Sequence, residues 1–208
     1  MCIRDRNIPA DEDLKVLMIT HKVLASQQGY EQLLDILGDG LRNKEDPFLI
    51  FFSDTVEPIY QALDTSNTQL LFDTLGIKRY PITKKSEKIK WKNLHDQLAE
   101  VRAQKAIDVL ETIVHSQLIP IPPKVHEGYR LYKNSPEKLY VSEATIQQFL
   151  QLDYEQFIAV RDFLYPDAPF STEHGVKGEE YDNVVFVISK GWNQYQFETY
   201  APMICLLY

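Results

Sequence analysis

The spacing of apolar residues along this chain predicts short strands near both ends and a series of helices between them. Two short apolar runs, residues 14–20 and 184–188, are too short to stand alone as helices, and we expect them to be buried strands. Apolar residues at helical spacing predict helices over residues 26–37, 55–63, 68–75, 91–118, 142–150 and 154–164. Residues 47–52 form one more short apolar run.

The order of these elements favours an α/β fold. A strand and a helix come first, a long and mostly helical stretch follows, and the chain then returns to a strand. A helical insertion between two parallel strands of one sheet is the simplest architecture that uses all of these elements. We therefore expect a parallel sheet with a mostly helical insertion.

A polar turn leads into the last strand. If that strand belongs to a parallel sheet, the turn lies at the mouth of the sheet, where α/β proteins place their ligands. The residue types and spacing across the turn are Thr172-x-His174-x-x-Lys177-Gly178-x-Glu180-Tyr181-x-x-Val184. The turn is thus a candidate binding site.

This turn resembles motif V of the UvrD/Rep-type superfamily 1 helicases, whose pattern is Thr-x-His-x-x-Lys-Gly-Leu-Glu-Phe before a strand. The sequence departs from the pattern at Glu179, where the family has leucine, and at Gly175, where serine is common. The alternative is a polar turn between two strands in which Lys177 and Gly178 only reverse the chain.

The resemblance implies a role for five residues of the turn. Thr172 and His174 would bind DNA, because a hydroxyl and an imidazole can donate hydrogen bonds to a phosphate. Glu180 would accept a hydrogen bond from the ribose of a nucleotide. Gly178 would allow close approach of the backbone, and Lys177 would hold the turn or contact a nucleotide phosphate.

The resemblance also implies a domain organisation. We expect a partial RecA-like parallel sheet, of the P-loop NTPase type but without the P-loop, in which residues 7–64 form the first part and residues 166–204 the second. Residues 65–165 would be the helical insertion. The two ends, residues 1–6 and 205–208, resemble translated sequencing adapters, and we expect them to be foreign to the natural protein.

The first strand and the residues after it lie where this family has motif IV. The likeness is looser than for motif V, because the arginine that often follows the strand is absent. His21 and Lys22 either contact nucleotide phosphates or are solvated turn residues.

The function implied is that of a fragment of an ATP-dependent DNA helicase, which acts on single-stranded or partly duplex DNA. ATP and Mg²⁺ would be the cofactors of the intact protein, and the missing N-terminal RecA-like domain would be the partner of this fragment. The chain has no Gly-x-x-x-x-Gly-Lys-[Ser/Thr] sequence, so we expect no ATP hydrolysis or unwinding by the fragment alone. The alternative is a non-enzymatic helical module that binds other proteins.

Charge restricts where DNA could bind. The net charge of -8 at pH 7 argues against binding through the whole surface. Residues 78–92, however, carry seven lysine and arginine residues against one acidic residue, Glu87. This stretch, including Lys84 and Lys85, is either a footprint for DNA phosphates with an aromatic ring available for stacking or a solvated loop.

Composition adds an expected location. The chain has neither an N-terminal signal peptide nor an apolar run of the roughly 20 residues that a membrane span needs. We expect a cytoplasmic protein with no membrane contact. Cys2 and Cys205 both lie in the expected foreign ends, so neither a disulfide nor a thiol metal site is predicted.

Overall fold

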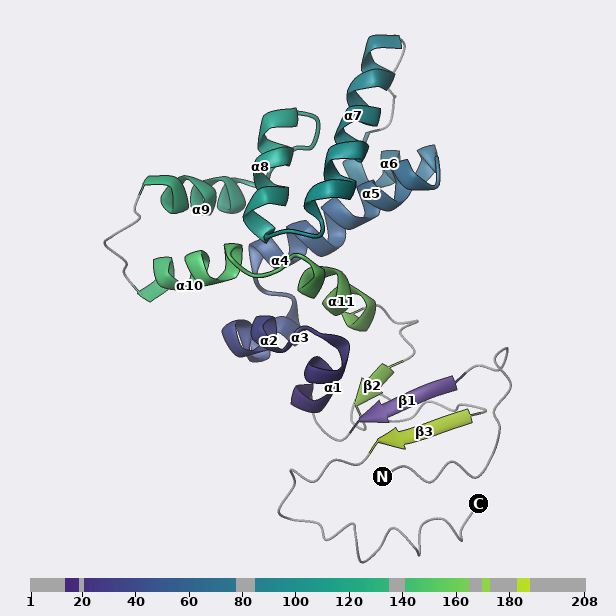
Figure 1. Cartoon of the computed structure of the whole chain (residues 1–208), viewed down its shortest axis with the longest axis vertical. Helices are drawn as coiled ribbons and strands as arrows, with labels where there is room; N and C mark the ends of the chain where they lie inside the picture. Colours follow the sequence, from purple (N-terminus) through teal and green to yellow (C-terminus); the bar gives the residue numbers. More distant parts are fainter. Residues whose placement is uncertain are drawn as a thin grey trace, which may run out of the picture. The chain divides into compact units, whose positions relative to one another are not determined.

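A computed structural model describes most of the chain, which divides into two compact units (Figure 1). One unit consists of residues 1–27 and 165–208, and the other consists of residues 28–164. The residues described are 14–18, 21–77, 85–134, 141–164, 170–172 and 183–187.

The first unit holds a small parallel sheet. Its strands are β1 (Leu14–Met18), β2 (Phe170–Thr172) and β3 (Asn183–Val187), in the order β2-β1-β3. The two neighbours of β1 thus come from the far end of the chain, as Figure 1 also shows. In the register of the sheet, Met18 lies opposite both Thr172 and Val187, so the three strands end at the same edge.

The predicted fold class was wrong. We expected an α/β fold with a partial RecA-like parallel sheet, but the part of the chain that the structure describes is mostly helical. The three strands have only 5, 3 and 5 residues. The physical reason is that the helices of residues 28–164 bury their apolar faces against one another, so the largest core of the described chain is a helical one.

In the described part of the second unit, helices account for all residues apart from the connections. Helix α1 (His21–Gln28) precedes it in the chain. The helices of the unit are α2 (Glu31–Leu37), α3 (Asp39–Asn43), α4 (Pro47–Phe51), the π-helix η1 (Phe52–Val56), α5 (Glu57–Asp64), α6 (Thr68–Leu75), α7 (Lys85–Val101), α8 (Ala106–Ser116), α9 (Pro123–Asn134), α10 (Val141–Leu150) and α11 (Glu155–Leu164). This unit begins at Gln28, whereas the predicted insertion begins at residue 65. None of the described helices is long and apolar enough to span a bilayer.

The helices α4, η1 and α5 run on without a break. Asp46 caps the start, since its Oδ1 accepts hydrogen bonds from the amides of Phe48 at 2.8 Å and Leu49 at 2.9 Å. In the π turn, the amide of Glu57 donates to the carbonyl of Phe52. Pro58 follows directly and has no amide to donate, so a regular α-helix would be interrupted here, and the wider π turn accommodates its ring.

A cluster of aromatic rings forms the centre of the helical unit. The ring of Phe157 lies 5.0 Å from that of Phe52, 4.9 Å from Phe149 and 5.7 Å from Tyr154, measured between ring centroids. Phe157 and Tyr154 have no exposed surface, and Phe52 has none either. The cluster therefore joins η1 to α10 and α11.

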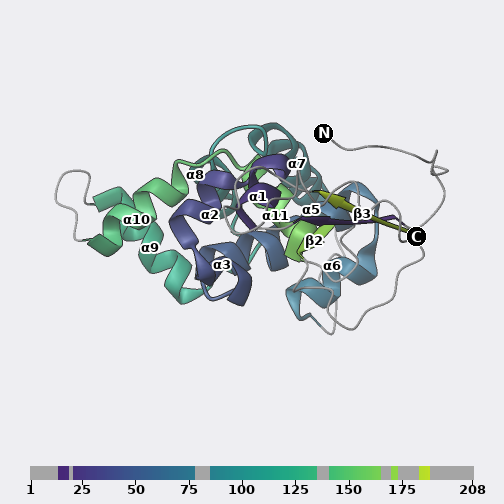
Figure 2. The ribbon, with the colours of Figure 1, turned by 90° about the horizontal axis from the view of Figure 1, so that it is seen from below.

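The contact between α9 and α4 depends on a glycine in α9. Helices α9 and α10 lie side by side (Figures 1 and 2), and α9 also contacts α4. At Gly128 of α9, a Cβ atom would lie 2.6 Å from Cζ of Phe48, which is too close for two carbon atoms. Phe48 is itself buried, with its ring 5.6 Å from that of Phe149, so it has little room to move.

We expect Gly128→Ala to destabilise the chain by about 1–2 kcal/mol. The clash with Phe48 outweighs the gain of roughly 1 kcal/mol that alanine brings to a helix interior. Urea unfolding followed by circular dichroism measures the change. Gly40→Ala is the control, because nothing lies within 4 Å of a Cβ at this helical position, and it should stabilise slightly. Equal stabilisation by both substitutions would contradict the close packing.

The two ends of the helical unit lie close together. The ring of Tyr30, just before α2, stacks on that of Phe163 in α11 with 5.8 Å between centroids. The amide of Leu33 donates to Oε1 of Gln156 at 3.1 Å, and Nε2 of Gln156 donates to Oε1 of Gln32 at 3.0 Å. These contacts hold α2 against α11.

Candidate functional site

The predicted nucleotide site lies mostly outside the described residues. Thr172 is the last residue of β2 and lies at the edge where all three strands end. The predicted DNA ligand His174 and the predicted nucleotide ligands Lys177, Gly178 and Glu180 fall in the part that the structure does not describe. Their roles therefore stay predictions.

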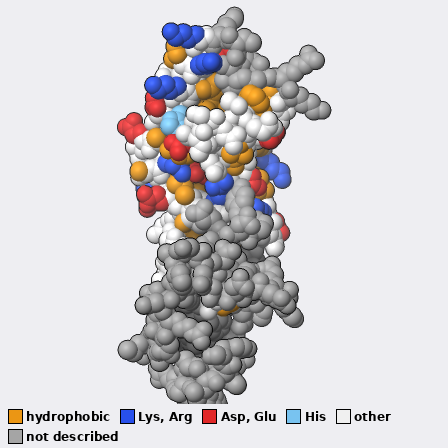
Figure 3. All heavy atoms as spheres, turned by 90° about the vertical axis from the view of Figure 1, so that its right-hand side faces the viewer, with side chains coloured by type: hydrophobic (Ala, Val, Ile, Leu, Met, Phe, Trp, Pro, Cys, Tyr) orange, Lys and Arg blue, Asp and Glu red, His pale blue; other side chains and the backbone are white. Residues whose placement is uncertain are grey.

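The described part of the basic stretch, residues 85–92, lies in helix α7 and not in a loop. Lys85 is the first residue of α7 and is exposed, while Lys84 lies outside the described residues. Figure 3 shows lysine and arginine side chains gathered beside hydrophobic ones on the upper part of this face of the helical unit. The ring of Trp91 is not available for stacking on a base, because this residue is only 9% exposed.

Similarly, His21 and Lys22 lie in a helix and not in a turn. His21 is the first residue of α1, and Lys22 is the second. His21 is half-buried, while Lys22 is exposed.

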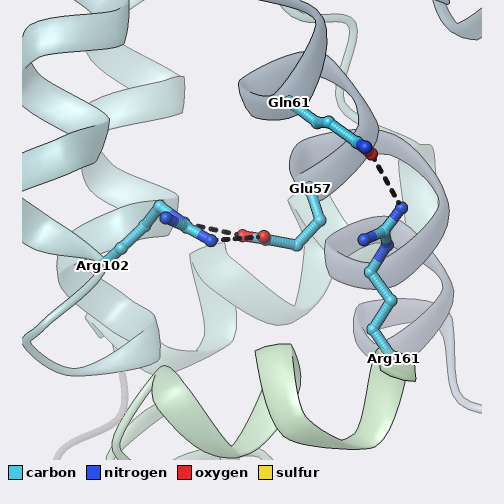
Figure 4. Close-up of polar contacts among 4 residues, drawn as sticks. All are labelled: Glu57, Gln61, Arg102 and Arg161. Atoms are coloured by element: carbon cyan, nitrogen blue, oxygen red, sulfur yellow. Dashed lines mark hydrogen bonds and ion pairs between the residues drawn. The ribbon is translucent and has the colours of Figure 1, made fainter. Parts of the chain in front are cut away.

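A nearly buried ion pair joins Glu57 to Arg102 in the helical unit (Figure 4). Nε of Arg102 donates to Oε1 of Glu57 at 3.0 Å, and Nη2 donates to Oε2 at 2.7 Å. The carboxylate is nearly buried, with 4% of its side chain exposed against 20% for Arg102. Partial burial lowers the pKa of Arg102, but the hydrogen bond and the negative charge of Glu57 more than offset it, so the pKa is raised.

Aromatic rings surround this pair. The guanidinium carbon of Arg102 lies 3.8 Å from the centroid of the Tyr60 ring, a cation–π contact. Burial raises the pKa of Tyr154 well above its ordinary value, and the negative charge of Glu57 raises it further. Tyr154 therefore keeps its proton throughout the physiological range.

A further polar contact joins α5 to α11. Figure 4 shows Gln61, one turn beyond Glu57 on α5, facing Arg161. Nη2 of Arg161 donates to Oε1 of Gln61 at 3.2 Å. The four side chains thus connect α5 to the end of α7 and to α11.

Chemically, this arrangement favours structure over catalysis. Both oxygens of Glu57 accept hydrogen bonds from Arg102, so the carboxylate is already occupied by a partner within the protein. Among the residues described, no group of three or more histidine, cysteine, aspartate or glutamate side chains could hold a metal ion. We assign the pair to holding the helices together.

A pocket of about 470 Å³ lies among α5, α6 and α7. Its walls include Ala62 and Leu71, which are buried, and Trp91, which is nearly so. Lys88 and Lys92 also line it. A concave, mostly apolar space with a few polar groups is the usual form of a ligand site.

Sequence reasoning missed both the ion pair and the pocket. Glu57 gave a weak signal, since it is the acidic residue among apolar neighbours in a predicted helix, but its partner lies 45 positions away. The pocket gave a partial signal in the alternation of lysines with Trp91 along residues 85–92. Neither signal shows which helices come together.

Comparisons with known proteins found no relative: no family model, no curated protein and no solved structure matches the chain.

Proposed function

We propose that this chain is part of an ATP-dependent DNA helicase of the UvrD/Rep type and contributes to nucleotide binding and to the grip on single-stranded DNA. The observation that carries the proposal is the motif from Thr172 to Val184, which resembles motif V of that family in residue type and spacing apart from Gly175 and Glu179.

The arrangement of the strands supports this proposal. Thr172 ends β2 at the same edge where β1 ends at Met18, and the chain after β1 continues into His21. Ligands of parallel sheets bind at the carboxyl ends of the strands. The segments that resemble motifs IV and V therefore leave the sheet at the same edge.

The proposed roles follow from the chemistry of the side chains. Thr172 and His174 donate hydrogen bonds to DNA phosphates, and Glu180 accepts one from the ribose of ATP. Lys177 contacts a nucleotide phosphate, and the backbone at Gly178 approaches it closely. Mg²⁺ and the phosphate loop belong to other parts of the intact protein, so this part alone is inactive.

Two further proposals concern the setting. Lys84 and Lys85 are proposed to contact DNA phosphates at the start of α7, where Lys85 is exposed. A cytoplasmic location is the second of these proposals.

Substitution of Glu180 tests the proposal. In the intact protein, Glu180→Ala is expected to weaken ATP binding about tenfold, because one hydrogen bond to a charged group is lost. Binding of an oligo-dT strand should change less than twofold. Titration of a fluorescent ATP analogue and of labelled oligo-dT measures the two affinities.

Glu179→Ala is the matched control, because it removes the same charge from the neighbouring residue. It should leave the affinity for ATP nearly unchanged. If the two substitutions have equal effects on ATP binding, the role of Glu180 is wrong. If the parent gene encodes no phosphate-loop motif, the helicase proposal as a whole is wrong.

A helical module that binds other proteins is the second candidate function. The pocket among α5, α6 and α7 favours it, because its walls are apolar and cations lie beside them.

A further inference from the structure

The pocket among α5, α6 and α7 is suited to bulky apolar side chains. Leu63, from α5, and Leu71 and Phe72, from α6, line one side, and Trp91 of α7 lines another. Leu71 is 4% exposed and Trp91 is 9% exposed, so both are fixed in the core and form rigid walls. At about 470 Å³, the pocket has room for one or two large side chains.

Cations lie beside these apolar walls. Lys88 and Lys92 of α7 both line the pocket and are exposed. They are four residues apart and therefore lie on the same face of the helix, one turn from each other. Lys85, three residues before Lys88, extends this face towards the start of α7.

The two pocket lysines are not themselves paired, although Asp64 and Asp96 lie 3.4 Å and 3.5 Å from His95, which also lines the pocket. Within the described ranges, neither Lys88 nor Lys92 forms an ion pair or a side-chain hydrogen bond. On a chain whose net charge is -8, two adjacent cations of this kind form a local positive patch. The ammonium groups of Lys88 and Lys92 are thus available to carboxylates of an acidic ligand.

We propose that this pocket docks an acidic peptide segment of another protein, with one or two bulky apolar side chains in the pocket and carboxylates on Lys88 and Lys92. The apolar walls supply binding energy by excluding water, and the two lysines set the orientation and the charge preference. This proposal does not rest on the helicase function.

The geometry favours a peptide over nucleic acid. Single-stranded nucleic acid needs exposed aromatic faces for stacking and a track of cations for successive phosphates. The aromatic ring of Trp91 is largely covered, and the floor of the pocket is aliphatic and aromatic side chains rather than a flat stacking surface. A side chain that enters the pocket suits these walls better than a base does.

Selection from a peptide library tests the proposal and needs no identified partner. Random peptides of about a dozen residues, displayed on phage, are selected on the whole chain and then measured by fluorescence polarisation. We expect the enriched peptides to combine aspartate or glutamate with phenylalanine, leucine or tryptophan. Lack of enrichment, or enrichment of basic peptides, would overturn the proposal.

Charge reversal locates the site. The double variant Lys88→Glu/Lys92→Glu should weaken binding of the enriched peptides about tenfold or more, since two attractive contacts become repulsive. The control Lys90→Glu/Lys124→Glu makes the same change in net charge at exposed positions that do not line the pocket, and it should weaken binding less than twofold. Equal losses in both variants would show that only overall charge matters and would overturn the site.

Two more measurements complete the test. Phe72→Ala should also weaken binding about tenfold, and thermal unfolding checks that the variant is folded. An oligo-dT strand should not displace the peptide at equal concentration. Displacement by oligo-dT that is lost in Lys88→Glu/Lys92→Glu would assign the surface to nucleic acid instead of a peptide.

Discussion

Glu57→Ala is expected to lower the free energy of unfolding by about 3 kcal/mol or more. The substitution leaves the partly buried guanidinium of Arg102 without the carboxylate that accepts two of its hydrogen bonds. Removal of one partner from a buried pair costs far more than the pair contributes, because an uncompensated charge stays in the interior. Urea unfolding followed by far-UV circular dichroism measures the loss.

An exposed ion pair in the same unit provides the control. Nζ of Lys105 lies 2.6 Å from Oδ1 of Asp153, but these side chains are 45% and 60% exposed. Asp153→Ala should therefore cost less than about 1 kcal/mol. The double variant Glu57→Met/Arg102→Met should recover part of the loss, since it removes both charges together. If Glu57→Ala costs no more than Asp153→Ala, the pair does not hold the helices together.

Phe157→Ala is expected to cost about 3–5 kcal/mol. The ring of Phe157 has no exposed surface and contacts the rings of Phe52, Phe149 and Tyr154. Alanine loses the transfer free energy of the ring and leaves a cavity that its neighbours fill only in part. The urea concentration at the unfolding midpoint should fall, and the near-UV circular dichroism signal of the aromatic residues should become weaker.

Ile89→Ala is the matched control for this substitution. Ile89 lies in α7 and is 50% exposed, so its removal creates no cavity. It should change the free energy of unfolding by less than about 0.5 kcal/mol. A similar loss for both substitutions would mean that the aromatic cluster is not the centre of the core.

Several helices could be predicted from the sequence because their signals are local. The expected helix over residues 68–75 is confirmed as α6, and those over 142–150 and 154–164 are confirmed as α10 and α11 within one residue. The apolar spacing that predicts each of these helices lies within the segment itself. Helix α9 was missed, because the prolines before it were interpreted only as the end of the preceding helix, although proline also suits a first helical position.

The single helix predicted over residues 91–118 was wrong, although Asp108, whose side chain accepts from the amide of Lys105 at 3.0 Å, gives a local signal for a helix that starts at Ala106. Helix α7 ends at Val101 and α8 begins at Ala106, with no glycine or proline between them. The break is made by tertiary contacts. The carbonyl of Gln104 accepts from the amide of Tyr154 at 2.8 Å, and the amide of Ala106 donates to the carbonyl of Leu152 at 2.9 Å.

The helix predicted over residues 26–37 was also wrong in extent. Helix α1 begins earlier and ends at Gln28, and α2 begins only at Glu31. Gly29 separates them with a φ of 83°, a conformation that other residues rarely adopt. The apolar spacing continues across Gly29, so it predicts one helix where the structure has two. The glycine itself is the residue that indicates the break between them.

The candidate sites also differ in whether their residues are close together or far apart in the sequence. The motif from Thr172 onward could be recognised because its residues are consecutive, and its predicted ligand contacts remain predictions. The Glu57–Arg102 pair and the pocket beside Trp91 depend on which helices meet. Amphipathic spacing predicts which face of each helix is buried, but it does not predict which other helix packs against that face.

The stacking of Tyr30 on Phe163 has an evolutionary consequence. Residues 28–164 enter and leave their unit at neighbouring points, since these two rings lie 5.8 Å apart. A segment whose termini meet can be gained, lost or exchanged as a cassette without separating the flanking strands that pair with each other. Related genes can therefore be expected to keep β1 and β3 while carrying cassettes of different length and surface.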